Sequence, residues 1–266
     1  MIIFLSTLFG LVVGSFLNVA ILRGEEEESI RGRSRCRGCK KTLTAQELIP
    51  ILSFLIQNGR CRNCKNPLLW QYPLVEGGTA ILFAVAAWLI FENTFLAADS
   101  WSFFYLLISS VVISAGIVIF VSDLRSFIIP DGAVIILLVC AVLFIFSSAY
   151  FGAGSSYIDL GKNIVTAVVL SGFLGGLWLF SGGTWMGLGD AKLFFPLALL
   201  LGFPTSLVAF LFSFWIGSLG AIALLFLKKF GLRDHIPFGP FILIGAALAF
   251  FYTDFFLQIS GLEHFF

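Results

Sequence analysis

The chain has 266 residues, of which 59% are hydrophobic and only 12% are charged, and its mean hydropathy is +1.02. Soluble domains carry about 25% charged residues, so this composition excludes an ordinary soluble protein and indicates an integral membrane protein. The net charge of +1 does not suggest a polyanionic partner, and we expect no nucleic-acid binding.

Eight apolar stretches are candidates for membrane-spanning helices, which need about 20 predominantly apolar residues each. They cover residues 2–22, 73–91, 102–121, 129–149, 163–180, 192–204, 206–227 and 237–257. The stretch 192–204 is the weakest candidate, because Pro196, Gly202 and Pro204 interrupt it and leave it short. The first stretch has no basic region ahead of it and no clean cleavage site, so we expect a retained helix.

The segment 23–72 is the one sizeable polar part of the chain. It contains CRGC at 36–39 and CRNC at 61–64, two CxxC pairs separated by 21 residues. This spacing is typical of a zinc site with four thiolate ligands, here Cys36, Cys39, Cys61 and Cys64, and the alternative is a set of reduced cysteines without metal. Two disulfides are disfavoured if the segment faces the cytosol, where thiols are kept reduced.

Two further features of the sequence have simpler interpretations. The acidic run Glu25 to Glu28 precedes a basic stretch, and such charge blocks are usually hydrated. Cys140 lies alone in the fourth apolar stretch, where we interpret it as a small apolar filler.

The positions of lysine and arginine predict the orientation, because positively charged loops stay cytoplasmic. Ten of the 16 fall in the loop between the first two spans, which places that loop in the cytosol. Alternation of eight spans then puts the segments 122–128, 181–191 and 228–236 on the same side, the last of them carrying Lys228, Lys229 and Arg233. Both chain ends are then predicted to lie outside.

Three acids mark the cytoplasmic ends of the predicted spans. Asp190, in GGTWMGLGDAKLFF, lies at membrane depth, where a carboxylate is costly and is by default a functional residue. Asp123 ends the third span, where the helix dipole disfavours negative charge, so it too suggests a task. Asp131 follows Pro130 and opens a helix, which favours a capping role there; capping is also the alternative for Asp190.

A pair formed by Asp123 and Asp190 would suit peptide hydrolysis. Two close carboxyl groups cannot both ionise easily, so they share one proton. The ionised acid can then take a proton from water while the other gives its proton to the peptide. The glycines beside Asp190 would let an extended substrate backbone come close.

Seven blocks of sequence carry a family resemblance along nearly the whole chain. They are GSFLNVAILR (14–23), the two CxxC pairs, LIPILSFL (48–55), YPLVEGGTA (72–80), DLRSFIIPD (123–131), MGLGDAKL (186–193) and PFGPF (237–241). Together they resemble the type IV prepilin peptidases, of the bifunctional leader peptidase and N-methyltransferase kind. The GLGD element is similar to the GxGD element of other intramembrane aspartyl proteases.

The resemblance implies a bacterial inner-membrane enzyme that cleaves type IV prepilins or type II secretion pseudopilins after a glycine at the cytoplasmic face. It would then methylate the new N-terminus with S-adenosylmethionine. Asp123 and Asp190 match the family's catalytic pair, and the four loop cysteines match its structural zinc ligands. Gly59 and Glu76 lie in matching blocks and are weak candidates for the methyl-donor site; a loop turn and an interfacial polar contact are equally good interpretations.

We therefore predict an all-α polytopic membrane protein of about eight transmembrane helices, with a small cytoplasmic zinc-binding loop domain between the first two. Its expected divisions are a first helix (1–22), a loop domain associated with methylation (23–72) and the protease helices (73–266). An alternative function is a transporter whose intramembrane acids bind protons or cations, since helices broken by Gly and Pro suit such sites. A third hypothesis, a non-catalytic zinc-binding scaffold in the membrane, would explain the cysteines but leave Asp123 and Asp190 without a role.

Overall fold

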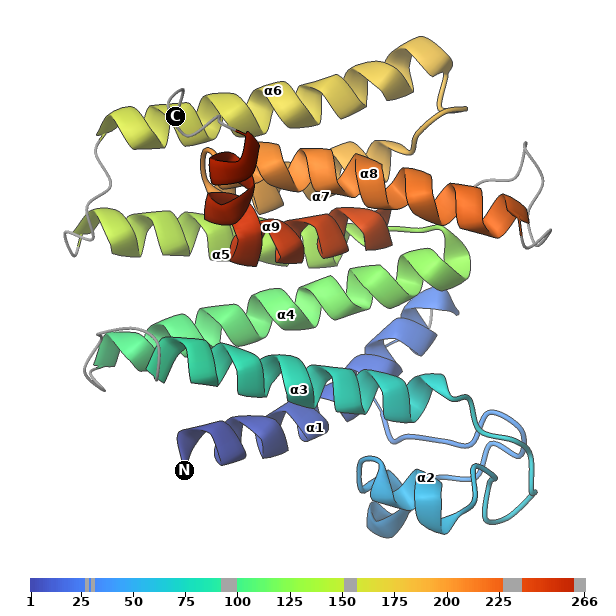
Figure 1. The fold of residues 1–266 in the computed structure, drawn as a ribbon. Helices are drawn as coiled ribbons and strands as arrows, with labels where there is room; N and C mark the ends of the chain where they lie inside the picture. The colour runs from blue at the N-terminus through green and yellow to red at the C-terminus, as the bar shows by residue number, and fades with distance from the viewer. Residues whose placement is uncertain (27–28, 30–31, 92–99, 151–156, 227–235, 261–266) are drawn as a thin grey trace. The chain divides into compact units, whose positions relative to one another are not determined.

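The computed structural model describes residues 1–26, 29, 32–91, 100–150, 157–226 and 236–260. Its long helices, drawn in Figure 1, are α1 (Ile2–Glu25), α3 (Gln71–Phe91), α4 (Ser100–Ser126), α5 (Asp131–Tyr150), α6 (Tyr157–Ser181), α7 (Leu188–Leu201), α8 (Thr205–Phe226) and α9 (Gly239–Ser260). Between α1 and α3 lie the short 3₁₀ helix η1 (Ala45–Leu48) and the short helix α2 (Leu52–Ile56). The described residues form isolated β-bridges but no strand, so the all-α prediction is confirmed.

All eight predicted apolar stretches are helices, and six of them are long and apolar enough to cross a membrane: α1, α3, α4, α6, α8 and α9. The chain is therefore a multi-pass membrane protein. Within its described residues, α5 is apolar over the shorter stretch Asp131–Ser147. Helix α7 has 14 residues, or about 21 Å at 1.5 Å per residue, which is less than the roughly 30 Å of the hydrocarbon core.

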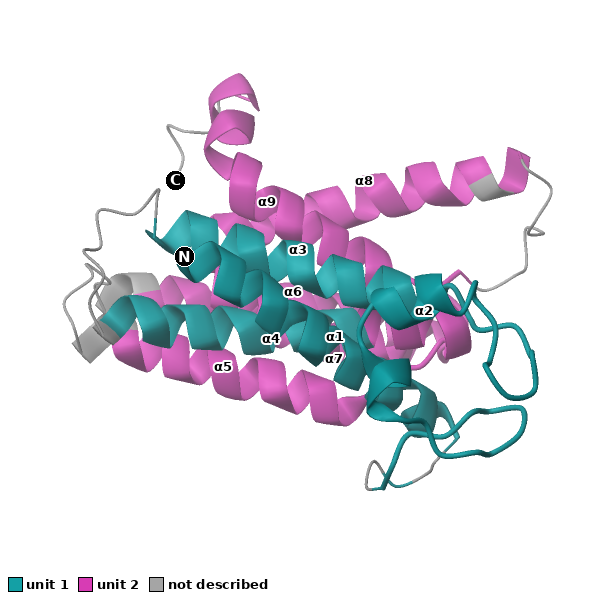
Figure 2. Cartoon of the chain, turned by 90° about the horizontal axis from the view of Figure 1, so that it is seen from below, with its two compact units in different colours: residues 1–118 teal, residues 119–266 magenta. Residues whose placement is uncertain are grey.

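The chain divides into two compact units, residues 1–118 and 119–266, which Figure 2 colours separately. The division falls within α4, so that the last turns of this helix belong to the second unit. The first unit contains α1, α3 and the polar segment between them. The second unit contains α5 to α9.

In the first unit, α1 packs closely on α3. A Cβ atom added to Gly10 would lie 2.7 Å from the Ala80 Cα atom, and one added to Gly14 would lie 2.8 Å from the Glu76 Cα atom. Glycines four residues apart lie on one helix face and let two backbones approach, as is common between membrane helices. Asn18 adds polar contacts, because its side-chain amide donates to the Tyr72 carbonyl oxygen at 3.2 Å.

In the second unit, α7 is the central helix and contacts α5, α6, α8 and α9. The residues that flank α7 in the sequence limit its length. It starts directly after Gly187 and ends at Gly202, whose φ of +69° is unfavourable for other residues; Pro204 then precedes α8. Most of α7 is buried, including Leu193, Phe194 and Ala198. Its first turn is therefore held inside the unit.

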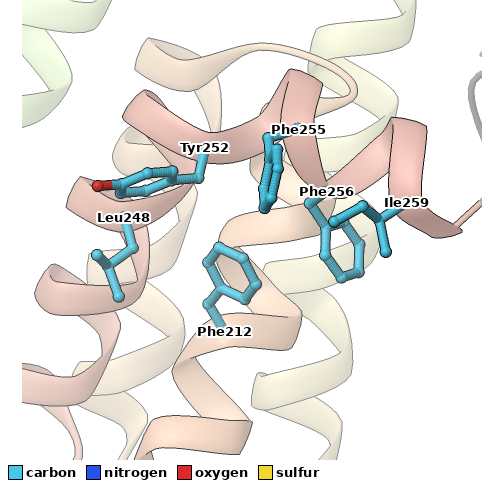
Figure 3. Close-up of a pocket in the computed structure, with 6 residues that line it drawn as sticks. All are labelled: Phe212, Leu248, Tyr252, Phe255, Phe256 and Ile259. Atoms are coloured by element: carbon cyan, nitrogen blue, oxygen red, sulfur yellow. The ribbon is translucent and has the colours of Figure 1, made fainter.

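Aromatic side chains fill much of the space between α8 and α9. A hollow of about 270 Å³ is lined by Phe212 of α8 and by Leu248, Tyr252, Phe255, Phe256 and Ile259 of α9. Figure 3 draws these side chains as sticks. The first of these residues on α9, Leu248, lies nine residues after Gly239, where α9 begins, which is about 14 Å along the helix axis. Tyr252, Phe255 and Ile259 are exposed, as expected for a helix pair that faces lipid.

Replacing Gly14 with alanine is expected to destabilise the protein by about 1–3 kcal/mol, because the new Cβ atom would overpack the contact between α1 and α3. Thermal unfolding of the purified protein in detergent measures this loss. Gly78→Ala in α3 is the matched control, since its added Cβ atom meets no atom within 4 Å. Equal melting temperatures for the two variants would contradict the packing argument.

Candidate functional site

Two acidic side chains are buried at helix ends in the second unit. Asp123 lies in the last turn of α4 and is 5% exposed, while Asp190 lies in the first turn of α7 and is 7% exposed. The two carboxyl groups are close enough to interact electrostatically. The structure thus brings together two acids that are far apart in the sequence and that sequence analysis selected as a pair.

Asp123 is held by the first residue of α9. The backbone N–H of Gly239 donates a hydrogen bond of 2.9 Å to Oδ2 of Asp123. The N-terminus of a helix is its positive end, so the carboxyl group is well placed there. A Cβ atom on residue 239 would lie 2.7 Å from the same oxygen. A larger residue at this position would therefore have to displace the carboxyl group of Asp123, and Pro240 after it fits the first turn of a helix.

Asp190 is held in a related way by its own helix start. The N–H of Gly187 donates to Oδ2 of Asp190 at 3.2 Å. This is the capping interaction that was the alternative explanation for Asp190, and it is present together with the burial of Asp190 and its electrostatic interaction with Asp123. The next glycine of the GLGD element, Gly189, packs on Ile129, which a Cβ atom would approach to 3.2 Å.

Asp131 has different surroundings from the other two acids. It opens α5 as expected, with its side chain 71% exposed, and its carboxylate accepts a hydrogen bond of 3.0 Å from Lys192 Nζ. A surface pair of this kind contributes little, typically 0–1 kcal/mol. Burial therefore separates Asp131 from Asp123 and Asp190.

In the first unit, the four loop cysteines converge. The Sγ atoms of Cys36, Cys39, Cys61 and Cys64 all lie within 4.8 Å of one another. Those of Cys36 and Cys64 are 3.8 Å apart, and sulfurs around a tetrahedral zinc with bonds of about 2.3 Å would be separated by about 3.8 Å. The four residues therefore have the number, chemistry and spacing of a zinc site. Cys140 is buried in α5, in the second unit.

The two CxxC segments have the same backbone shape. In each, the N–H of a lysine donates to the carbonyl oxygen of the first cysteine, from Lys40 to Cys36 at 2.8 Å and from Lys65 to Cys61 at 3.0 Å. Both lysines have a positive φ, +57° and +60°. The first cysteine of each pair is buried and the second is more exposed. Repetition of one turn thus aims all four sulfurs at one point.

Backbone and side-chain donors surround the sulfur atoms. The N–H of Lys41, followed by the side-chain amide of Asn63, lowers the pKa of the Cys39 thiol to about 6. For Cys64, the N–H of Asn66 lowers the pKa, but burial and the three neighbouring sulfurs outweigh this and raise it to about 11. Four thiolates at this spacing repel one another, and a divalent cation would offset that repulsion.

Glu76 and Gly59, the two weak candidates for the methyl-donor site, have different surroundings in the structure. Glu76 is 6% exposed, and its Oε2 accepts a hydrogen bond of 2.7 Å from the N–H of Ile51. Ile51 has a φ of +59°, a strained conformation for a β-branched residue. Gly59 forms a turn with a φ of +65° against the ring of Phe54.

A cavity of about 540 Å³ lies beside the contact between Glu76 and Ile51. It is enclosed by the second half of α1, the polar segment and the start of α3, all within the first unit. Glu76 lines it and Gly59 does not. Neither this cavity nor the hydrogen bond from Gly239 to Asp123 could be predicted from the sequence.

Comparison with known proteins agrees with these features. Residues 8–90 match the Bacterial Peptidase A24 N-terminal domain, and residues 110–222 match the Type IV leader peptidase family. A prepilin leader peptidase/N-methyltransferase from Bacillus subtilis (strain 168) is 34% identical over 257 residues, which is 93% of each chain. Proteins of the same description from Aeromonas hydrophila and Pseudomonas putida are each 30% identical and cover 93% and 94% of this chain, respectively, and 89% and 90% of their own lengths.

No solved structure matches the chain. The two family matches, together with relatives of at least 30% identity over about nine tenths or more of both chains, decide the classification. This chain belongs to the type IV leader peptidase family.

Proposed function

We propose that this protein is a membrane-embedded aspartyl endopeptidase that removes the leader of type IV prepilins or type II secretion pseudopilins after a glycine. It then methylates the new N-terminal residue with S-adenosylmethionine. The observation that carries the peptidase assignment is the buried pair Asp123 and Asp190, each held by a glycine N–H. The relatives named prepilin leader peptidase/N-methyltransferase support both activities.

The arrangement suits general acid–base hydrolysis of a peptide bond. Each glycine N–H engages Oδ2 of its acid, and among the described residues no other group occupies Oδ1. The ionised acid takes a proton from the attacking water, and the protonated acid gives its proton to the carbonyl oxygen. The tetrahedral intermediate then collapses: the acid that took the proton from water gives it to the leaving amine, and the other acid regains a proton from a hydroxyl group of the intermediate. Asp123 and Asp190 are the catalytic residues in this proposal.

The four loop cysteines would hold a structural zinc ion. Cys36, Cys39, Cys61 and Cys64 provide a closed set of four sulfur ligands, which is typical of structural rather than catalytic zinc. When bound, the metal would neutralise the thiolates and hold the two CxxC turns together.

We assign residues 23–72 to the methylating part of the enzyme and the helices in 73–266 to the peptidase, as the sequence analysis expected.

The proposed location is the bacterial inner membrane, with the loop domain in the cytosol and both chain ends outside. Ten basic residues in the loop between α1 and α3 support this orientation. The third basic segment, with Lys228, Lys229 and Arg233, lies outside the described residues. A prepilin with its apolar helix in the bilayer would present its cleavage site at the cytoplasmic face. The alternative function as a transporter has no support from the relatives.

The peptidase assignment predicts that Asp123→Asn and Asp190→Asn each lower the rate of prepilin cleavage by a factor on the order of 10²–10⁴, because each removes one proton-transfer group. The assay uses purified protein in detergent and a prepilin-like substrate. Asp131→Asn is the matched control, and it should keep a rate near that of the wild type because Asp131 is exposed. Wild-type cleavage by a folded Asp123→Asn or Asp190→Asn variant would exclude the proposed pair.

A second prediction concerns the residue that positions Asp123. Gly239→Ala should lower kcat by up to about 100-fold with little change in KM, since its Cβ atom would push the carboxyl group out of place. Gly132→Ala, also in the first turn of a helix, is the control because its added Cβ atom meets no atom within 4 Å. If both variants cleave at the wild-type rate, the close contact between Gly239 and Asp123 has no catalytic importance.

Zinc removal should unfold the loop domain. The purified protein is expected to contain about one zinc ion per chain, and chelation should open the segment between α1 and α3 to proteolysis. Elemental analysis and limited proteolysis measure the two effects. Cys39→Ser should lose the metal, while Cys140→Ala, which changes a cysteine outside the cluster, should keep it. A chelated protein that resists protease as well as the zinc-loaded form would rule out a structural role.

A further inference from the structure

We infer that the cavity beside Glu76, lined by residues of α1, the loop domain and the start of α3, is the binding site of the methyl donor, a sulfonium nucleoside. This inference rests on the proposed methyltransferase activity and adds its location. The cavity measures about 540 Å³ and belongs entirely to the first unit. Sites for small molecules typically measure about 300–1,000 Å³, so the size is suitable.

The walls of the cavity offer one kind of group for each part of such a ligand. The aromatic rings of Phe54 and Tyr72 provide flat apolar surface for an adenine base. The carboxyl group of Glu76 can accept hydrogen bonds from ribose hydroxyls. Arg35 and Lys40 are exposed on the outer part of the wall and can pair with the carboxylate of the amino-acid portion.

Glu76 is fixed in its position at the cavity wall. Its Oε2 is engaged by the N–H of Ile51 at 2.7 Å, and the hydroxyl of Ser15 lies beside it. Ile51 keeps a strained φ of +59° in this contact. Strained backbone that is held by a buried side chain is concentrated at ligand sites, because it positions groups that would otherwise relax. The contact therefore joins the loop domain to α3 at the point where the ligand would bind.

The chemical step needs only the donor and the new N-terminus of the cleaved substrate. The neutral amine nitrogen forms a bond to the methyl carbon while the bond between that carbon and sulfur breaks. The sulfonium becomes a neutral thioether, and the amine loses one proton to water. The cavity lies where α1 ends and α3 begins, which are two boundaries of membrane spans. The amino end of a membrane-anchored substrate would also lie at such a boundary.

The test is direct binding of S-adenosylmethionine and of S-adenosylhomocysteine to the full-length protein in detergent, by calorimetry. Ser53 of α2 lines the cavity, so Ser53→Trp should weaken binding of both nucleosides at least 10-fold. The same variant should lose N-methylation while it cleaves prepilin at the wild-type rate. Leu55→Trp is the matched control, since Leu55 lies on the same short helix, is exposed and does not line the cavity.

The possible outcomes separate this inference from the proposed function. Wild-type affinity in Ser53→Trp would overturn the location of the site but not the methyltransferase activity. Absence of both binding and methylation in the wild type would overturn the activity itself. If Ser53→Trp loses cleavage and is misfolded, Glu76→Gln decides instead. Its amide oxygen can still accept from Ile51, so the fold should persist while nucleoside affinity falls, and unchanged affinity would reject the site.

Discussion

The carboxyl groups of Asp123 and Asp190 lie among helices that are almost entirely apolar, and each must find a hydrogen-bond donor there. Backbone N–H groups in the middle of a helix cannot serve as donors, because they are already paired with carbonyl oxygens of the same helix. The N–H groups at the start of a helix are free to donate. Asp190 accepts a hydrogen bond from the N–H of Gly187 at the start of α7, and Asp123 accepts one from the N–H of Gly239 at the start of α9. Helices α7 and α9 therefore begin beside the two acids.

The position of α7 follows from this requirement, because its start places the N–H of Gly187 beside the carboxyl group of Asp190. Helix α7 starts after Gly187, is surrounded by α5, α6, α8 and α9, and stops at Gly202. The first unit solves a similar problem with different donors. There, the carboxyl group of Glu76 receives the N–H of Ile51, and backbone N–H groups are directed at the sulfur atoms.

Much of this structure could be predicted from the sequence. The eight helices follow from apolar length, because hydrocarbon requires every backbone amide to be paired within its own segment. Asp123 and Asp190 were identifiable because an acid in an apolar chain at the ends of two spans is costly. The cysteine cluster was identifiable from the spacing of the CxxC pairs, which brings ligands together through local turns.

Other features could not be predicted, because they depend on contacts between distant segments. Gly239 is 116 residues from Asp123, and nothing in PFGPF shows which acid its N–H would meet. Gly10 and Gly14 have the spacing of a helix-packing pair, but the partner helix α3 is known only from the structure. The left-handed conformation of Ile51 has no sequence signal, since β-branched residues disfavour it. The cavity beside Glu76 is enclosed by α1, the polar segment and the start of α3, which come together only in the folded first unit.

The most direct test of the account is whether Asp123 and Asp190 act as one unit. Single-turnover cleavage of a prepilin substrate should be measured for the two single Asn variants and for the double variant, each checked for folding. If the acids share one proton and one water, the double variant should be no slower than the slower single variant, since removing either acid disables both. Losses that multiply in the double variant would show that the two residues act independently and would contradict the shared mechanism.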